Sequence, residues 1–288
     1  MKSALDNLFE SQTREWPLLA QGIEGLKRAA TRKVQVAWFD VFIRHIPHRI
    51  ASTTAAVDRA SIAKRPCFLC AANLPPEEKG LQFDDDYTIY CNPFPILDRH
   101  ITIVHREHRP QRIAGQLHAM LRLAKGLPGH FIVYNGPECG ASAPDHMHFQ
   151  ACARNLFPIE QDAKRRDGIY IPDYFRNVLV FQNTRLTERA IDVLGALTNA
   201  ASEPMINIAA FYEQGAFTLF LFPRGKHRPS AFHSGELTVS PASIDLCGIF
   251  VAPVEKDFEK ITARDVGNIY KEVTLPDPIF RKLVEQLS

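Results

Sequence analysis

The chain has 288 residues, and its 34 basic and 32 acidic side chains give a formal charge of +2. This near-neutral balance argues against a nucleic-acid-binding protein with a broad basic face, and 45% apolar residues exclude global disorder. No stretch approaches the roughly 18 apolar residues that span a bilayer, and the polar N-terminus lacks the features of a secretory signal. Six scattered cysteines indicate reduced thiols. We therefore expect a cytoplasmic protein with neither a membrane nor a nucleic-acid partner.

The first part of the chain is predicted to mix helices with strands. Helical periodicity runs from residue 3 to about residue 30 and is interrupted at Pro17, which cannot occupy a helix interior. Alternating apolar and polar residues then favour one strand at 33–43. Further along we expect, in order, strands at 86–96 and 100–106, a helix at 110–127, and two strands that meet in a glycine-containing loop at 135–145.

The second part follows a charged, loop-rich stretch at 155–175. Its expected elements are a strand at 178–182, a helix at 186–199, a strand pair at 206–224, a strand at 248–255 and helical segments up to Ser288. Because connections between adjacent strands are short, antiparallel pairing is favoured over a doubly wound sheet. We therefore predict an α+β fold of two diverged halves, residues 1–155 and 156–288, with antiparallel sheets and flanking helices.

The segment from His146 to Gln150, HMHFQ, carries the clearest chemical pattern. On a strand, His146, His148 and Gln150 project to one face, and the apolar residues between them project to the other. Two imidazoles and an amide are costly to bury without partners. The H-x-H pattern alone is more often structural than functional. Together with Gln150 and the preceding loop, whose small residues let backbone N–H groups approach an anion, it favours a phosphate-handling site.

The stretch YNGPECGASAPDHMHFQ, residues 134–150, resembles the active-site signature of the transferase branch of the histidine-triad superfamily. This branch includes galactose-1-phosphate uridylyltransferases, diadenosine tetraphosphate phosphorylases (ATP adenylyltransferases) and GDP-sugar phosphorylases. Its members replace the third histidine of the triad by glutamine, as at His146, His148 and Gln150. The strong resemblance covers about residues 65–155, and the C-terminal half matches only loosely, in its strand pattern and in the stretch LFPR, residues 221–224. It implies histidine-triad-like sheets.

The resemblance also implies roles for individual residues. His148 would be the nucleophile that attacks the α-phosphorus of a nucleotide donor, and His146 and Gln150 would complete the catalytic group. Gln150 would donate its amide N–H to a phosphate oxygen. The nucleotide and phosphate contacts would be shared by Asn135, Gly140, Ser142 and Gln150. No organic cofactor is implied.

The function implied is nucleotidyl transfer or phosphorolysis through a covalent nucleotidyl-histidine. The donor would be a nucleoside diphosphate sugar or a dinucleoside polyphosphate, and the acceptor a sugar 1-phosphate or inorganic phosphate. Two alternatives remain open, a histidine-triad nucleotide hydrolase and a nucleotide-binding module without activity. Related enzymes are often dimers, which leaves a homodimer open as well.

Cys67 and Cys70 have the C-x2-C spacing of a zinc half-site. The residues themselves leave the other ligands open among His105, His108 and His146, and buried reduced thiols without a metal are the alternative. In uridylyltransferases with this motif, zinc is completed by a histidine in the strand-to-helix turn and by the first histidine of H-x-H. The resemblance therefore implies a structural zinc held by Cys67, Cys70, His108 and His146.

Overall fold

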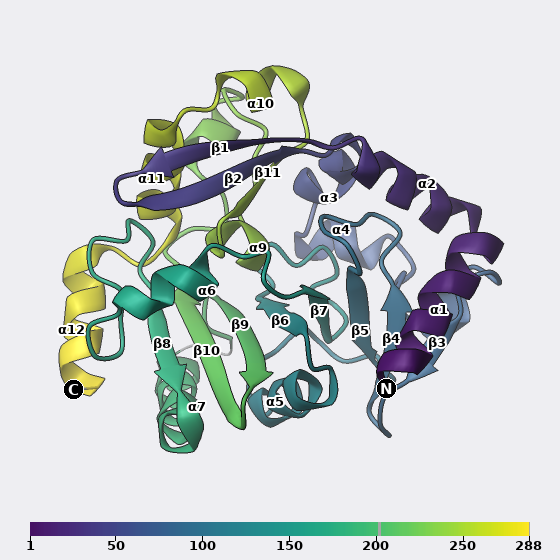
Figure 1. Ribbon diagram of the computed structural model, residues 1–288, viewed down its shortest axis with the longest axis horizontal. Coiled ribbons are helices and arrows are strands. Elements are labelled where there is room, and N and C mark those ends of the chain that lie inside the picture. The colour runs from purple at the N-terminus through teal and green to yellow at the C-terminus, as the bar shows by residue number, and fades with distance from the viewer. Residues whose placement is uncertain (201–202, 288) are drawn as a thin grey trace.

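An eight-stranded sheet is the largest element of the protein (Figure 1). The structure is a computed structural model that describes residues 1–200 and 203–287. Every neighbouring pair in this sheet is antiparallel. In spatial order its strands are β3 (Gly80–Gln82), β4 (Tyr87–Cys91), β5 (Ile101–His105), β7 (His148–Ala153), β6 (His130–Asn135), β9 (Ile206–Glu213), β10 (Ala216–Pro223) and β8 (Leu179–Gln182).

The two halves of the chain meet within this sheet. Strand β6 of the first half pairs with β9 of the second, from Ile132 opposite Ala210 to Asn135 opposite Asn207. Both strands are buried along almost their whole length, so pairing edge to edge satisfies backbone groups that have no access to water. The predicted α+β class with antiparallel strands is confirmed, and the strands of both halves form one continuous sheet.

A second, smaller sheet consists of β1 (Ala30–Val36), β2 (Phe39–His45) and β11 (Ile249–Ala252). Strands β1 and β2 form an antiparallel hairpin, whereas β11 pairs with β2 in parallel. The single strand expected at 33–43 is therefore wrong. The chain reverses at Ala37, which adopts a positive φ of 54° without the glycine that usually marks such a turn.

The helices lie on both sides of the large sheet. Pro17 begins the second helix, at the position where its missing N–H costs nothing. The α-helices are α1 (Lys2–Glu15), α2 (Pro17–Lys27), α3 (Ile50–Thr53), α4 (Arg59–Ala63), α5 (Leu117–Gly126), α6 (Ile159–Asp162), α7 (Asn183–Ala200), α8 (Ser230–His233), α9 (Ser243–Leu246), α10 (Glu255–Lys260), α11 (Ala263–Val273) and α12 (Asp277–Leu287). Short 3-10 turns occupy Pro47–Arg49, Ala71–Asn73 and Ala163–Arg165. Ser288, the expected end of the last helical segment, lies outside the described residues.

Two apolar cores flank the large sheet and determine where a site can form. Helices α1, α5, α7 and α12 pack on one face, and Figure 1 shows α5 and α7 on the side away from the small sheet. The small sheet, α9 and α11 cover β6, β8, β9 and β10 on the other face. Over β4, β5 and β7 that second face is covered instead by the α1–α2 junction, α3 and the loop at 65–78, which leave a cavity.

No helix within the described ranges, 1–200 and 203–287, is both long and apolar enough to cross a bilayer.

Candidate functional site

A cavity of about 610 Å³ lies on the sheet over β4, β5 and β7. This volume is in the range of small-molecule and cofactor sites. Apolar side chains, among them Trp16, Phe68 and Phe94, line much of the wall, and His148 and Gln150 lie at one end. The alternation of β7 explains this placement, because Phe149 between them is buried in the helix-covered core. The cavity therefore combines an apolar wall with a polar end.

The ring of His148 is held in one orientation and one tautomer. Nδ1 lies 2.8 Å from the carbonyl oxygen of His146, and since a carbonyl only accepts, Nδ1 carries the hydrogen. Nε2 then bears a free lone pair, and the ring lines the cavity. Burial lowers the pKa of His148 to about 4, so the imidazole is neutral near pH 7. Such an imidazole can act as a nucleophile toward a group in the cavity.

Gln150 is oriented by a histidine that the sequence did not predict as functional. His100 Nδ1 accepts a hydrogen bond from the backbone N–H of Ile96 (3.2 Å), so its Nε2 carries the hydrogen and donates to Gln150 Oε1 (2.7 Å). Burial lowers the pKa of His100 to about 3, which keeps the ring neutral. With its oxygen engaged, Gln150 presents its amide nitrogen to the cavity as a donor. Nothing in the sequence around His100 indicates that it orients Gln150, because it is a single histidine before a buried strand.

The backbone of His148 is held by a second unpredicted residue, Gln111. If the register of β6 and β7 continued, Asn135 would lie opposite His148, two residues beyond the last pair, Val133 and Gln150. The buried Gln111 side chain lies between them instead. Its Nε2 donates to the carbonyl oxygens of Asn135 (2.9 Å) and His148 (3.0 Å), and its Oε1 accepts from the His148 N–H (2.8 Å). One amide thus replaces the last hydrogen bonds of the strand ladder.

The loop predicted to bind phosphate, residues 135–145, both lines a cavity and is hydrogen-bonded to the second half of the chain. Asn135, Gly140 and Ser142 line a small polar cavity of about 40 Å³ beside the larger one, and Ser142 and Gln150 line both. Asn135 Oδ1 already accepts hydrogen bonds from Asn207 Nδ2 and the Ser243 N–H, both at 2.9 Å. Asn135 therefore anchors the loop to the second half of the chain.

Gly140 is required by backbone geometry. Its φ is +96°, and a Cβ at this position would lie 2.6 Å from the Cβ of Ala242. The glycine therefore lets the loop pass close to the second half of the chain.

Arg49 brings the positive charge that the sequence motif lacks. It lines both cavities and donates one hydrogen bond, from Nη1 to the carbonyl oxygen of Phe94 (3.1 Å). Burial lowers the pKa of its guanidinium to about 10, which still leaves it charged at neutral pH. A cation at the shared wall of the two cavities is suited to a phosphate group. No motif around Arg49 indicates this in the sequence.

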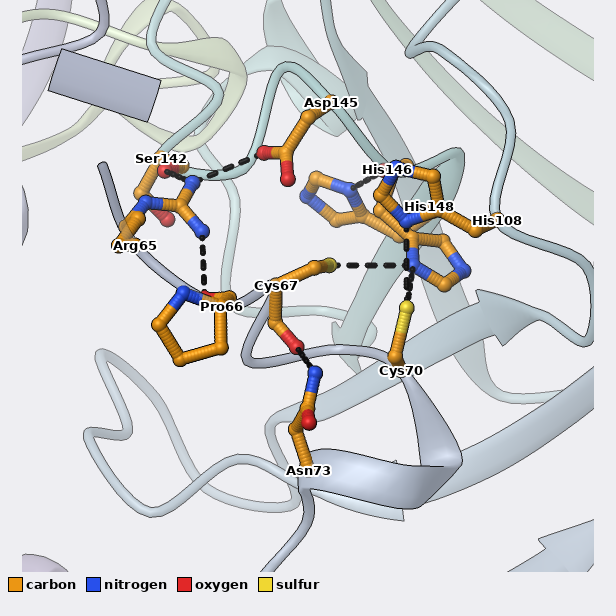
Figure 2. A network of polar contacts seen from close by, with 10 residues as sticks. All are labelled: Arg65, Pro66, Cys67, Cys70, Asn73, His108, Ser142, Asp145, His146 and His148. Atoms are coloured by element: carbon orange, nitrogen blue, oxygen red, sulfur yellow. Dashed lines mark hydrogen bonds and ion pairs between the residues drawn. The ribbon is translucent and has the colours of Figure 1, made fainter. Parts of the chain in front are cut away.

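Cys67, Cys70, His108 and His146 form one cluster, in which the four candidate ligand atoms lie within 4.8 Å of one another. Figure 2 shows the two sulfurs facing the two imidazoles. Nδ1 of His146 lies 3.3 Å from Cys67 Sγ and 3.5 Å from Cys70 Sγ, and Nδ1 of His108 lies 3.2 Å from Cys70 Sγ. The four residues that the resemblance implied are thus brought together and are able to hold a metal ion.

The tautomer of His146 suits a ligand. Its Nε2 lies 2.7 Å from the carbonyl oxygen of His105 and must donate there, so the lone pair of Nδ1 faces the sulfurs. His105, the other candidate, lies outside the cluster, and its Nδ1 accepts from the Glu107 N–H (3.0 Å). His146 precedes β7 rather than lying in it, and it is not among the residues that line the cavity. It acts on His148 through its carbonyl oxygen.

The chain matches two family profiles over almost its whole length. One, described as a domain of unknown function (DUF4922), matches residues 8–153, and the other, described as a GDPGP1-like C-terminal domain, matches residues 158–288. The chain belongs to the DUF4922 family. No curated protein sequence matches it.

Solved structures place the fold of this DUF4922 protein. Yeast Ap4A phosphorylase Apa2 in complex with AMP is similar over 94% of this chain and 96% of its own, with 15% identity and a TM-score of 0.63. The same enzyme in complex with Ap4A is similar over 94% and 98%, with 17% identity and a TM-score of 0.61. The chain therefore has the fold of this phosphorylase, one of the kinds of protein that the resemblance named, and the resemblance is confirmed at the level of the fold.

We expect Gln111→Met to destabilise the protein. The change leaves the N–H and carbonyl of His148 and the carbonyl of Asn135 without partners in a buried place, and each lost hydrogen bond there costs about 1 kcal/mol or more. The free energy of unfolding in urea should fall by about 3 kcal/mol. Gln161→Met, at an exposed position of α6, is the control and should change it little. Equal stability of both variants would contradict the role given to Gln111.

We expect His100→Phe to lower kcat of the nucleotidyl transfer proposed below by about 10- to 100-fold, because the Gln150 amide loses its fixed orientation. KM should change little, since His100 does not line the cavity. His130→Phe is the matched control, because the two ring nitrogens of this half-buried histidine are themselves buried and find no hydrogen-bond partner among the described residues. An unchanged kcat for His100→Phe, or an equal loss for both variants, would refute the positioning role.

Proposed function

We propose that this protein transfers a nucleoside monophosphate from a nucleoside diphosphate sugar or a dinucleoside polyphosphate to inorganic phosphate or a sugar 1-phosphate. The observation that carries this proposal is the pair at the end of the cavity. His148 presents the lone pair of Nε2, and beside it Gln150 presents an amide donor that His100 holds in place. A fixed neutral nucleophile beside a fixed neutral donor suits attack on a phosphate ester.

In the first step, Nε2 of His148 attacks the α-phosphorus of the donor. The bond from phosphorus to the bridging oxygen breaks, and its electron pair leaves with the sugar 1-phosphate or nucleotide. As Nε2 becomes bonded, the positive charge on the ring is shared with Nδ1–H, whose hydrogen bond to the His146 carbonyl becomes stronger. Gln150 donates to a non-bridging oxygen of the α-phosphate.

In the second step, an oxygen of the acceptor phosphate attacks the same phosphorus, and the bond to Nε2 breaks. The electron pair returns to the imidazole, and His148 is again neutral. Arg49 holds the phosphate that leaves and the one that enters, because its guanidinium lines the wall between the two cavities. Asn135, Gly140 and Ser142 form the wall of the smaller one and contact the phosphates.

We propose a structural zinc at the Cys67, Cys70, His108 and His146 cluster. Zn–S bonds of about 2.3 Å and Zn–N bonds of about 2.0 Å in a tetrahedron separate donor atoms by roughly 3.3–3.8 Å. The sulfur–nitrogen distances of 3.2–3.5 Å fit this geometry. When bound, zinc would neutralise the thiolates and brace the loop at Cys67 against His146. Since the cluster does not line the cavity near His148, its role is support rather than contact with substrate.

We propose that the two halves of the chain, residues 1–155 and 156–288, have different roles. The first carries the nucleophile, the amide donor and the metal cluster. The second supports the phosphate loop through Asn207, Ser243 and Arg224, of which Arg224 donates to Asn207 Oδ1.

The covalent intermediate is tested directly with donors labelled at the α-phosphate. Wild-type protein incubated with a panel of nucleoside diphosphate hexoses and dinucleoside tetraphosphates should yield a labelled protein, isolated in alkali because phosphoramidates are acid-labile. His148→Ala should abolish labelling, and His118→Ala, at an exposed position of α5, should retain it. Labelling of His148→Ala, or no adduct with any donor, would contradict the mechanism.

Release of the label distinguishes the proposed transfer from hydrolysis. We expect the adduct to be discharged faster by inorganic phosphate or a sugar 1-phosphate than by water alone. Equal rates would identify a nucleotide hydrolase instead.

We expect about one zinc ion per chain in protein purified without chelator, and none in the double variant Cys67→Ser, Cys70→Ser. The double variant should unfold at a lower temperature and retain roughly one-tenth to one-hundredth of the activity, because the cluster acts only on the position of His148. Cys247→Ala removes a buried thiol elsewhere and should keep its zinc. Metal content is measured by atomic emission, and wild-type protein without metal would contradict the assignment.

A further inference from the structure

One wall of the two cavities is not held by the apolar core. The segment 49–56, which contains helix α3, forms this wall, and its residues Arg49 and Ser52 line both cavities. Within 47–66, all of which the structure describes, no residue is buried. A surface segment without buried apolar contacts opens easily unless polar contacts hold it. The position of the wall therefore depends on its hydrogen bonds.

The hydrogen bonds that hold the wall come from Arg228, in the second half of the chain. Its Nη2 donates to the carbonyl oxygens of Thr53 (2.9 Å) and Ala55 (3.0 Å). Among the described residues, these are the only hydrogen bonds or ion pairs that join 50–64 to another part of the chain. Because the donor is charged, each bond is stronger than one between neutral groups.

Arg228 is itself fixed in place. Its Nε donates to Ser240 Oγ (3.2 Å), and its Cζ lies 4.3 Å from the centre of the Phe232 ring. The loop before it is held by the buried Arg224, whose Nη2 donates to the carbonyl oxygens of residues 226 and 227, both at 2.9 Å. The guanidinium that reaches the wall is therefore oriented by contacts within the second half.

Helix α3 connects the end of the wall that Arg228 holds to Arg49. The helix is one turn long, begins directly after Arg49 and ends at Thr53. The turn is closed by the hydrogen bond from the Thr54 N–H to the carbonyl oxygen of Ile50 (3.0 Å). A displacement of Thr53 would therefore move the backbone of Arg49, whose guanidinium lines both cavities.

Resting on the nucleotidyl transfer proposed above, we propose that Arg228 is a positioning residue, which holds the wall at 49–56 in place and thereby sets Arg49 against the phosphates. Arg228 lines neither cavity, so it acts through the wall and not by contact with substrate. The half of the chain without the nucleophile thus completes the phosphate-binding end of the site. Lysine would serve less well at 228, because an ammonium group lacks the planar fork that donates in several fixed directions.

The tie between Arg228 and the wall is tested by hydrogen exchange, measured by mass spectrometry without ligand. Peptides that cover 50–57 should exchange about tenfold or more faster in Arg228→Gln, because the wall opens more often once its charge-assisted hydrogen bonds are lost. Peptides of β9 should exchange as in the wild type, which shows that the fold is intact. Lys226→Gln is the matched control, because Lys226 lies in the same loop but pairs with Glu272 (2.7 Å). It should exchange as the wild type does.

The effect on the site is tested by affinity. Calorimetry with AMP, GMP, CMP and UMP identifies the nucleotide that wild-type protein binds most tightly, and this nucleotide is the probe. Arg228→Gln should bind it about tenfold more weakly, Arg228→Lys should lose less, and Lys226→Gln should bind it as the wild type does. In protein that carries Arg49→Met, Arg228→Gln should cause little further loss, because Arg228 acts through Arg49.

Unchanged exchange at 50–57 in Arg228→Gln would overturn the proposal, and so would unchanged affinity. Losses that add fully in the double variant would overturn it as well, because they would show that Arg228 does not act through Arg49. These results would leave nucleotidyl transfer standing, since labelling of His148 tests that separately. Faster exchange in Arg228→Gln, with no nucleotide bound and no adduct in the wild type, would refute the transfer and keep the tie between Arg228 and the wall.

Discussion

The hydrogen bond from Nδ1 of His148 to the carbonyl oxygen of His146 is the interaction on which the site depends. It determines which ring nitrogen keeps its lone pair, and it holds only while the turn before β7 keeps its shape. Gln111 fixes that turn from the strand side, and the cysteine–histidine cluster fixes it from the loop side. Residues from distant parts of the chain are thus used to hold a single carbonyl group in place.

Buried polar side chains also hold one another in place where the two halves of the chain meet. Asn135 ends the first half's contribution to the sheet, and Asn207 opposite it is held in turn by Arg224. These polar groups are buried, so each must find a partner, and together they form a network in which every member orients the next. The loop beside Gln150 is therefore held by several buried hydrogen bonds, which suits the phosphate binding that we propose for it.

The sequence predicted the site correctly where the arrangement of side chains follows from a single short segment. Alternation along β7 placed His148 and Gln150 on one face, and the cluster gathered the cysteines and histidines that the resemblance implied. It failed where a role arises only when distant segments meet. His100, Gln111 and Arg49 are ordinary residues in unremarkable stretches, and their functions come from contacts with other strands. The hairpin at Ala37 was missed because its turn lacks glycine.

The parallel pairing of β2 with β11 has a consequence for how the chain is made. The two strands are separated by more than 200 residues, from His45 to Ile249, so the hairpin of β1 and β2 leaves the ribosome long before its neighbour exists. Contacts of such long range slow folding, because the loop between them must close first. During synthesis one edge of β2 stays open to pairing with other chains. The small sheet of the first half therefore cannot be completed before the second half is nearly made, although the first half holds the residues that we propose are catalytic.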